Sequence, residues 1–340
     1  NRELAKKLTI KHNSVAVVTD GSAVLGLGNI GPEAAIPVME GKALLFKQLA
    51  DIDAWPVCLD TQDTDEIVET VRRIAPVFGG INLEDISAPR CFEVERRLQD
   101  LGIPVFHDDQ HGTAIVLLAG LLNACRITGK QISDLRIVIN GAGAAGIAIT
   151  NILRDDGPGD KIIAKDIIVC DTQGAIHAGR TDLNSEKQEL LRYTNFENRN
   201  GSIQEVMKGA DVFIGVSKAN LLTADHVRTM AKDSMIFALA NPVPEIMPAE
   251  AKLGGAAIIG TGRSDFPNQV NNALAFPGIF RGALDAGARK ITDEMKIAAA
   301  RALAEMVKNP TPEHILPRVL DPAVSATVAK AVYKAAHDQA

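Results

Sequence analysis

The chain has 340 residues, of which 46% are hydrophobic and 23% are charged, the balance of a folded globular protein long enough for two domains. Its net charge of −6 gives no basic surface for nucleic acid or an anionic membrane, and no apolar run approaches the roughly 18 residues that span a bilayer. The four cysteines are widely spaced and form no Cys-x-x-Cys pair, which predicts reduced, buried thiols in a cytoplasmic protein.

Short apolar runs alternate with longer helical patterns in the first part of the chain. Strands are predicted at residues 15–19, 55–59, 78–83 and 104–107, with helices at residues 32–50, 65–75 and 89–101. Residues 112–128 form a strongly apolar pattern that predicts a helix buried on most sides. This alternation is typical of a parallel sheet with crossover helices.

The second part of the chain repeats the rhythm. Strands are predicted at residues 135–140, 166–171, 211–216, 235–238 and 257–259, with helices between them. From Thr292 onward, two or three terminal helices are predicted, broken at Asn309 to Pro312. The sequence therefore predicts a two-domain α/β fold. A parallel-sheet domain spans residues 1–108, and a Rossmann-type domain spans residues 109–340, with its C-terminal helices packing on the first domain.

Two acidic pairs follow predicted strands. Glu84 and Asp85 follow one apolar run, and Asp108 and Asp109 follow another at the start of a helix. Carboxylates at neighbouring strand ends are able to converge on one hard divalent cation such as Mg²⁺ or Mn²⁺, which prefers oxygen ligands. Alone, Glu84 and Asp85 also fit a helix cap before Ser87. A cation site beside a dinucleotide fold suggests chemistry on an oxygen-bearing acid.

A Gly-x-Gly-x-x-Gly pattern occurs twice, and its context separates the two copies. Gly141, Gly143 and Gly146 follow a strand and open a helix, with Ala144 and Ala145 at its start. Such a loop brings backbone N–H groups against a pyrophosphate. Asp171 ends the next strand, where its carboxylate is able to accept the adenosine ribose hydroxyls, which favours NAD. The nearby Arg180 keeps NADP open.

The first copy comprises Gly26, Gly28 and Gly31. It precedes a helix that Pro37 and Gly41 are expected to interrupt early. We interpret it as a tight turn that packs helix against strand, in preference to a second nucleotide site.

Seven motifs together resemble the short bacterial form of the malic enzyme family, in order and spacing, over essentially the whole chain. They are Ala23-Val-Leu-Gly-Leu-Gly-Asn-Ile-Gly31, Pro37-Val-Met-Glu-Gly-Lys42, Gly79-Gly-Ile-Asn-Leu-Glu-Asp-Ile86, Phe106-His-Asp-Asp-Gln-His-Gly-Thr113, Asn140-Gly-Ala-Gly-Ala-Ala-Gly146, Ala240-Asn-Pro242 and Asn268-Gln-Val-Asn-Asn272. The resemblance implies oxidative decarboxylation of (S)-malate to pyruvate and CO₂, with NAD(P)⁺ and Mn²⁺ or Mg²⁺. It also implies a homodimer.

Residue roles follow from the resemblance at matching positions only. Glu84, Asp85 and Asp109 match the metal ligands, Lys42 matches the catalytic base, and Asp108 matches the aspartate that supports this lysine. Burial and a nearby divalent charge are expected to lower the pKa of Lys42, so that a neutral amine takes the malate hydroxyl proton.

Three asparagines match the residues around substrate and nicotinamide. Asn241 and Asn272 match positions that hold both molecules, and Asn271 is the neighbour of Asn272. Asn271 and Asn272 also fit a cap for the helix at residues 273–286. The active site is expected in the cleft between the two domains.

The chain departs from the family pattern in two places. The family's final acid is a tyrosine in an amino-terminal Tyr-Thr-Pro motif, whereas the only tyrosines here, Tyr193 and Tyr333, have non-matching surroundings. The first domain is therefore predicted to lack its first segment. Larger members carry a carboxylate-binding arginine before the first glycine motif, where this chain has Ser22 and Ala23. Arg263 is a candidate to replace this arginine, by its charge only.

Three alternatives remain open. A malolactic reaction would convert malate to lactate with the nicotinamide kept bound. A catalytically impaired protein that binds NAD and metal and regulates a partner would explain the missing tyrosine. An amino-acid dehydrogenase fits less well, because its chemistry does not require the acidic cluster.

His107 and His111 are predicted to have structural or supporting roles, since no cysteine or third histidine accompanies them as in zinc sites.

Overall fold

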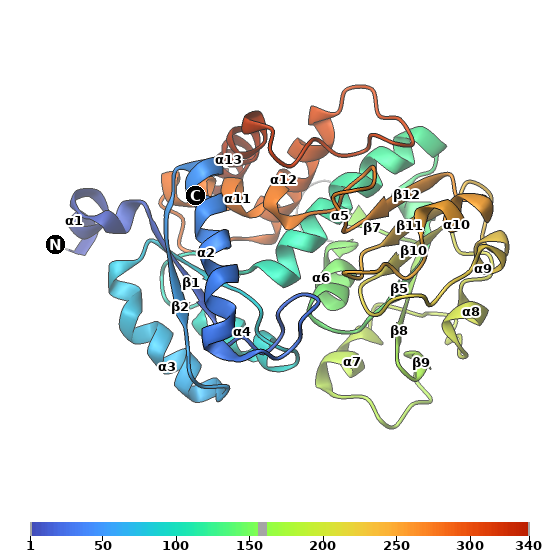
Figure 1. Ribbon diagram of the computed structural model, residues 1–340, viewed down its shortest axis with the longest axis horizontal. Helices are drawn as coiled ribbons and strands as arrows, with labels where there is room; N and C mark the ends of the chain where they lie inside the picture. Colours follow the sequence, from blue (N-terminus) through green and yellow to red (C-terminus); the bar gives the residue numbers. More distant parts are fainter. Residues whose placement is uncertain (1, 156–161, 339–340) are drawn as a thin grey trace. The chain divides into compact units, whose positions relative to one another are not determined.

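The computed structural model describes residues 2–155 and 162–338. The chain forms two compact units (Figure 1). Unit 1 comprises Asn1–Ile115, Asn272–Leu303 and Arg318–Ala340, and unit 2 comprises Val116–Asn271 and Ala304–Pro317. The units are thus discontinuous in sequence, whereas the predicted domains divide the chain once, after residue 108. That boundary remains a prediction.

Unit 1 contains a four-stranded parallel sheet. Its strands are β1 (Ser14–Thr19), β2 (Asp53–Cys58), β3 (Gly80–Leu83) and β4 (Val105–His107), in the order β2-β1-β3-β4. All residues of β1 and β3 are buried, as expected for strands covered on both faces. Because the strands are parallel, their carboxyl ends meet at one edge of the sheet.

The helices of unit 1 come from both ends of the chain. They are α1 (Arg2–Leu8), α2 (Gly31–Ala50), α3 (Thr64–Ile74), α4 (Arg90–Leu98), α11 (Phe276–Asp285), α13 (Pro322–His337) and most of α12 (Asp293–Met306). Short 3-10 turns lie at Ile10–His12, Ala75–Val77 and Asn272–Leu274. Helix α3 shows why such segments are helical: Asp63 caps its amino end by accepting hydrogen bonds from the backbone N–H groups of Asp65 and Glu66.

The expected interruption of α2 is wrong. The helix continues through Pro37 and Gly41 for 20 residues. Its buried face, which includes Met39 and Phe46, packs into the core, and this packing outweighs the local cost of proline and glycine.

Aromatic side chains join α2, α11 and β4 in the core of unit 1. The Phe46 ring lies 4.7 Å from the Phe276 ring and 5.4 Å from the Phe280 ring, and Phe280 lies 5.9 Å from Phe106. On α11, an added Cβ at Gly278 or Gly282 would crowd α13, so these glycines permit the close pairing of the two helices. A segment near the end of the chain thereby packs beside α2 (Figure 1).

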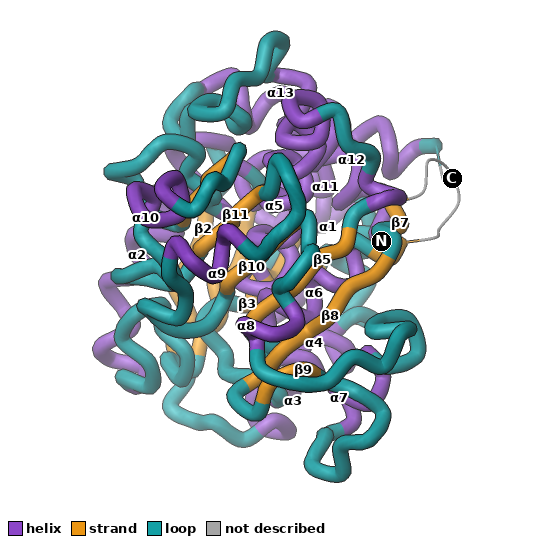
Figure 2. The backbone as a smooth tube through the Cα atoms, turned by 90° about the vertical axis from the view of Figure 1, so that its right-hand side faces the viewer, coloured by secondary structure: helices purple, strands orange, loops and turns teal. Residues whose placement is uncertain are grey.

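Unit 2 contains a six-stranded sheet in the order β12-β11-β10-β5-β8-β9. The strands are β5 (Arg136–Asn140), β8 (Asp166–Asp171), β9 (Gly174–Ala175), β10 (Val212–Gly215), β11 (Met235–Ala238) and β12 (Ile258–Thr261). Figure 2 shows β10, β5 and β8 running side by side. All neighbours are parallel except β8 and β9, and the order reverses between β5 and β10. The predicted α/β class and Rossmann-type sheet are confirmed.

The remaining elements of unit 2 are short apart from helix α5. They are α6 (Ala144–Ile152), α7 (Ser185–Leu190), α8 (Ile203–Val206), α9 (Ala224–Arg228) and α10 (Pro248–Leu253), with a two-stranded ribbon of β6 (Arg154–Asp155) and β7 (Ile162–Ile163) and a 3-10 turn at Ile132–Asp134.

Helix α5 spans Asp108–Thr128 and begins four residues before its predicted start. Asp108 and Asp109 therefore form its first turn, where the helix dipole favours carboxylates. Among the described helices, only α5 is long and apolar enough to cross a membrane, but 67% of its apolar window is buried inside the structure. This burial is typical of a core helix.

Candidate active site

Four carboxylates gather at the carboxyl edge of the unit 1 sheet. Glu84 and Asp85 follow β3, and Asp108 and Asp109 follow the neighbouring β4. The register pairs Leu83 with His107, so the two acidic pairs leave adjacent strands at the same level. The parallel sheet thus brings together side chains that are 24 residues apart in sequence.

Three of these carboxylates have the geometry of a cation site. One oxygen each from Glu84, Asp85 and Asp109 lies within 4.8 Å of the others. The backbone N–H of Asp85 donates to Asp109 Oδ2 at 2.7 Å, and Asp85 adopts a left-handed φ of 54° that is uncommon outside glycine and asparagine or aspartate. An all-oxygen set of this kind fits Mg²⁺ or Mn²⁺.

The raised pKa values of these carboxyl groups also favour a cation site. Burial, followed by the charges of Asp109 and Glu84, raises the pKa of Asp85 to about 9. Burial also raises the pKa of Asp109 to about 6, against the opposing effect of Lys42. Buried carboxylates that repel one another are costly, and a divalent cation would remove that cost.

Lys42 reaches this cluster from α2. Its Nζ lies 2.9 Å from Glu84 Oε2, pairs with Asp108 Oδ2, and sits 3.9 Å from the centre of the Phe276 ring. Burial alone would lower the pKa of Lys42, but the charges of Asp108 and Glu84 outweigh it and raise the pKa. The expected lowering is therefore not found without a divalent ion, because two carboxylates face the ammonium.

Asp108 lies between Lys42 on one side and Gly112 on the other. It is fully buried, it pairs with Lys42, and its Oδ1 has no hydrogen-bond partner among the described residues. An added Cβ at Gly112, one turn along α5, would overlap this Oδ1 and lie 3.0 Å from Asn272 Cβ. The glycine thus leaves room for the Asp108 carboxylate and brings the Asn272 side chain beside it.

Replacing Gly112 by alanine is therefore expected to lower kcat/KM about 10- to 100-fold, because Asp108 must move away from Lys42. Gly120→Ala on the same helix is the matched control, since its added Cβ meets only ordinary contacts at 3.5 Å or more. Steady-state kinetics and thermal unfolding of both variants test this. Full activity in the Gly112 variant would contradict the proposed role of the Asp108–Lys42 geometry.

Glu95 was not singled out from the sequence. It lies on α4 and accepts from the His107 backbone N–H at 3.0 Å, and its carboxylate contacts His111 Nε2 at 2.9 Å. The His107 ring is buried, with neither nitrogen hydrogen-bonded to a described residue. These contacts anchor the strand-to-helix turn that carries Asp108 and Asp109. A buried glutamate inside an amphipathic helix has no sequence signal of its own.

The second glycine loop lies in unit 2 at the end of β5, where the sheet order reverses. An added Cβ at Gly141 would crowd the Val216 carbonyl, and one at Gly146 would overlap the Gly141 carbonyl, whereas Gly143 has open space around it. Ala144 and Ala145 begin helix α6. The backbone is thus able to approach a ligand at the amino end of α6.

Asp171 ends the neighbouring strand β8 and is engaged by two cations. Arg180 donates to both carboxylate oxygens, at 2.8 and 3.0 Å, and Lys187 Nζ donates to Oδ2 at 2.6 Å. Burial raises the pKa of Asp171, but the bonds from Arg180 and Lys187 dominate and lower it to about 2. The sequence pointed to Arg180 and missed Lys187, which lies 16 residues away.

The other predicted positions are divided between the units. Asn272 lies in unit 1, and Asn271 and Asn241 lie in unit 2, with Asn241 following β11. Arg263 is already committed, because Nε and Nη2 bind Asp265 and Nη1 donates to the Pro242 carbonyl at 2.9 Å. Of the tyrosines, Tyr193 donates to Asn151 and Tyr333 packs against His337.

The first glycine motif forms a tight turn, as predicted. Gly28 and Val24 exchange backbone hydrogen bonds of 2.8 and 2.9 Å, and Gly26, Gly28 and Gly31 all have positive φ. An added Cβ at Gly21 would overlap the Gly31 carbonyl, so the turn holds the start of α2 against the end of β1.

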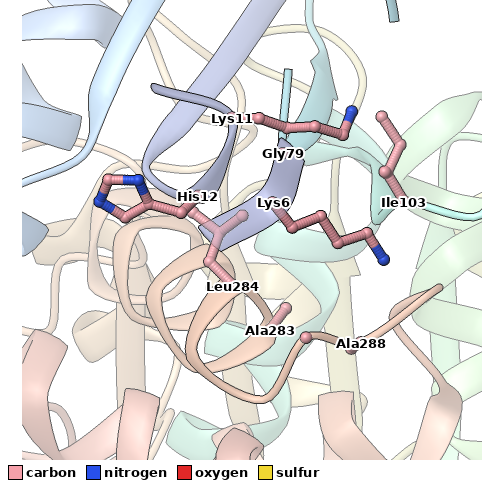
Figure 3. Close-up of a pocket in the computed structure, with 9 residues that line it drawn as sticks. Lys6, Lys11, His12, Gly79, Ile103, Ala283, Leu284 and Ala288 are labelled. Atoms are coloured by element: carbon pink, nitrogen blue, oxygen red, sulfur yellow. The ribbon is translucent and has the colours of Figure 1, made fainter. Parts of the chain in front are cut away.

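A separate pocket in unit 1 shares no residue with the carboxylate cluster (Figure 3). Lys6, Lys11 and His12 give it a basic lining. However, Lys11 Nζ donates to the carbonyls of Ala75, Pro76 and Phe78 at 3.0, 3.1 and 2.5 Å. The Lys11 side chain thus has a structural role at the end of α3, and the pocket gains little from its charge.

All four cysteines are free, as predicted. Cys58 is only partly buried, whereas buried thiols were expected.

The sequence matches two family profiles, described as "Malic enzyme, N-terminal domain" over residues 2–99 and "Malic enzyme, NAD binding domain" over residues 110–337. This chain belongs to the malic enzyme family. The resemblance inferred from the seven motifs is thereby confirmed.

The relatives of this malic enzyme chain differ in the coenzyme that their names state. It is 58% identical to the bifunctional malic/malolactic enzyme of Bacillus subtilis, with 96% of this chain and 80% of that protein covered. It is 56% identical to the NAD-dependent malic enzyme of Geobacillus stearothermophilus, with 98% and 69% covered. It is 48% identical to the NADP-dependent malic enzyme of Escherichia coli, with 98% of this chain but only 45% of that protein covered.

A solved structure agrees with the fold. The crystal structure of the NAD-dependent malic enzyme from Thermotoga maritima superimposes with a TM-score of 0.94 at 48% identity, covering 98% of this chain and 87% of that one.

Proposed function

We propose that this chain catalyses the oxidative decarboxylation of (S)-malate to pyruvate and CO₂ with reduction of NAD(P)⁺. The observation that carries the proposal is the group of Glu84, Asp85 and Asp109 beside the Lys42–Asp108 pair, in a member of the malic enzyme family. The names of relatives such as the Geobacillus stearothermophilus enzyme support the substrate and the coenzyme.

The experiment that tests the proposal measures NADH formation from (S)-malate with Mn²⁺, beside CO₂ release from added oxaloacetate. Activity in both assays is expected. Binding of NAD and Mn²⁺ with neither activity would favour the catalytically impaired alternative.

Glu84, Asp85 and Asp109 are proposed to hold Mn²⁺ or Mg²⁺. The bound cation would act as a Lewis acid that draws electrons from the substrate oxygens. Within this arrangement Lys42 is proposed to accept the C2 hydroxyl proton as hydride leaves C2. Its raised pKa depends partly on the charge of Glu84, and that charge is offset when Glu84 becomes a ligand. Asp108 then orients the amine.

Asn272, Asn271 and Asn241 are proposed to bind the substrate, and Asn241 also the nicotinamide. The closeness of Asn272 to Gly112 and Asp108 supports the first of these roles. Amide side chains suit a substrate with carboxylate and hydroxyl groups, because they both donate and accept hydrogen bonds.

The glycine loop from Gly141 to Gly146 is proposed to bind the coenzyme pyrophosphate, with NAD preferred and NADP possible. Asp171 is the proposed acceptor for the ribose hydroxyls. The two cations on Asp171 reduce its repulsion of a 2′-phosphate, so the carboxylate alone does not exclude NADP.

Arg180→Gln is therefore expected to lower kcat/KM for NADP about 10- to 100-fold more than for NAD, because a phosphate loses a charged partner. Asp171→Asn is expected to have the opposite effect and to lower kcat/KM for NAD more than kcat/KM for NADP. Arg192→Gln, which removes an exposed pair with Glu189, is the control. Equal effects of Arg180→Gln on both coenzymes would count against this assignment.

A malolactic reaction is the second candidate, favoured by the name of the Bacillus subtilis relative. In that reaction pyruvate is reduced to lactate before release, and no net NADH appears. Lactate formation from malate without NADH accumulation would replace the first proposal with the second.

The protein is further proposed to be a cytoplasmic homodimer. The size of the protein in solution tests the assembly, and a monomer at all concentrations would contradict it.

A further inference from the structure

A buried charge pair lies beside the proposed metal ligands, at the end of β1. Asp20 follows this strand, and its side chain is fully buried. Arg90, the first residue of α4, donates from Nη2 to Asp20 Oδ2 at 2.7 Å and to Ser22 Oγ at 2.9 Å. Ser22 Oγ in turn donates to Asp20 Oδ1 at 2.6 Å. The two hydrogen bonds that Nη2 donates thus hold the guanidinium in one orientation.

Arg90 retains unused donors. Its Nε is buried and has no hydrogen-bond partner among the described residues, and its Nη1 also donates to none of them. The side chain is 20% exposed, and of the two unused nitrogens only Nε is fully buried, so a ligand has access to Nη1. Buried donors without partners are rare in folded proteins, and one next to a polar cluster indicates a missing acceptor.

Short contacts connect this arginine to the carboxylate cluster. β1 and β3 are neighbouring strands, so Asp20 lies one strand away from Glu84 and Asp85 at the same edge. The Ala23 backbone N–H donates to the Asp85 carbonyl at 2.9 Å, and the Ser87 N–H donates to Ser22 Oγ at 2.9 Å. The loop that contacts Asp85 therefore also holds Arg90.

The acceptor that suits such a group is a carboxylate. An oriented guanidinium with free N–H groups is a strong partner for carboxylate oxygens, more so where water is partly excluded. The other cations of the proposed site are less available, since Lys42 is paired with Asp108 and Glu84, and Arg263 is paired with Asp265.

We infer that Arg90 binds the C1 carboxylate of the substrate, the one that remains in the product. This rests on the proposed function. The C4 carboxylate loses its charge as CO₂ leaves, so a cation on it would stabilise the reactant more than the transition state. The C1 carboxylate keeps its charge throughout, and a cation there stabilises substrate, transition state and pyruvate alike. Arg90 is thus a substrate-binding residue that affects KM more than kcat.

The test uses oxalate, a small dianion that resembles the C1 end of the enolate of pyruvate. Its binding to the Mn²⁺-loaded protein is measured by calorimetry for the wild type, Arg90→Gln and Arg90→Lys. Loss of a charged hydrogen bond is expected to raise the oxalate Kd about 10- to 100-fold in Arg90→Gln. The KM for malate is expected to rise by a similar factor, with kcat changed less than about 5-fold. Lysine should recover part of the affinity.

Two controls separate binding from folding. Arg97→Gln removes another arginine–aspartate pair of α4, with the exposed Asp65, and should leave both constants unchanged. Because Arg90→Gln leaves Asp20 buried without a partner, the double variant Asp20→Asn/Arg90→Gln is measured too. It should show the same loss of oxalate affinity with a recovered melting temperature.

The outcomes distinguish this inference from the proposed function. Unchanged oxalate Kd in both Arg90→Gln proteins overturns the inference, even if malate is oxidised normally. A raised malate KM with unchanged oxalate Kd also overturns it, since the contact would then lie at C4. A wild type that binds oxalate through Arg90 but does not oxidise malate supports the inference while the proposed function fails.

Discussion

Lys42→Arg is expected to lower kcat for (S)-malate oxidation about 10³-fold while the protein stays folded. Arginine keeps the positive charge between Asp108 and Glu84, but a guanidinium does not lose its proton in a protein and is unable to act as a base. Lys42→Ala should lose similar activity, and added primary amines should restore part of it, because they supply the missing base.

Kinetics with the substrate in excess, together with melting temperatures, check this expectation. Lys47→Arg is the matched control on the same helix, since Lys47 is exposed and pairs with Asp51 and Asp53. Activity of Lys42→Arg within about tenfold of the wild type would remove Lys42 from the role of base.

The second large effect is expected at the proposed metal ligands. Asp109→Asn should weaken Mn²⁺ binding at least about 100-fold and abolish turnover at ordinary Mn²⁺ concentrations, because an anionic ligand is lost. Calorimetric titration of Mn²⁺ measures the binding directly. Asp65→Asn, an exposed carboxylate paired with Arg97, is the control. Unchanged Mn²⁺ affinity in Asp109→Asn would place the metal elsewhere.

The same cluster predicts how metal and pH act together on stability. The pKa is raised to about 9 for Asp85 and to about 6 for Asp109, whereas both lie near 4 in an unfolded chain. Between these values the two carboxyl groups bind more protons in the metal-free folded chain than in the unfolded chain, so their contribution to stability falls as pH rises from about 4 to about 9.

Mn²⁺ replaces those protons, so the rise in melting temperature that it causes should be larger at about pH 8 than at about pH 5.5. Thermal unfolding with Mn²⁺ and with a chelator, at both pH values, tests this. A metal-induced rise that is larger at the lower pH would contradict the assignment of these ligands.

Family, fold class and strands were within reach of the sequence. Each predicted strand is present in the structure, because short apolar runs between turns have few other solutions in an α/β chain. Burial is not the common reason, since no residue of β2 is buried. Helix limits were less well predicted. Pro37 and Gly41 looked like breaks, and α5 starts at Asp108 rather than at Gly112, since buried side chains distant in sequence stabilise both helices.

The candidate site was predictable only in part. Strand ends pointed to Glu84, Asp85 and Asp109, because parallel strands end at one edge. The family resemblance assigned Asp108 to support Lys42, and the structure pairs these two side chains across 66 residues of sequence. The sequence did not indicate that this pairing depends on the missing side chain of Gly112. It also raised the question of which cation replaces an arginine at Ser22 and Ala23, and it offered only Arg263.

The sequence by itself therefore determined the family, the α/β class, the acidic pairs and the glycine loop, since these depend on local order and spacing. Only the tertiary structure decided which side chains meet. It committed Arg263 to Asp265, placed two cations on Asp171, and set Arg90 against Ser22 with donors unused. Side-chain contacts depend on how strands and helices pack across long sequence separations, and neither composition nor motif spacing carries that information.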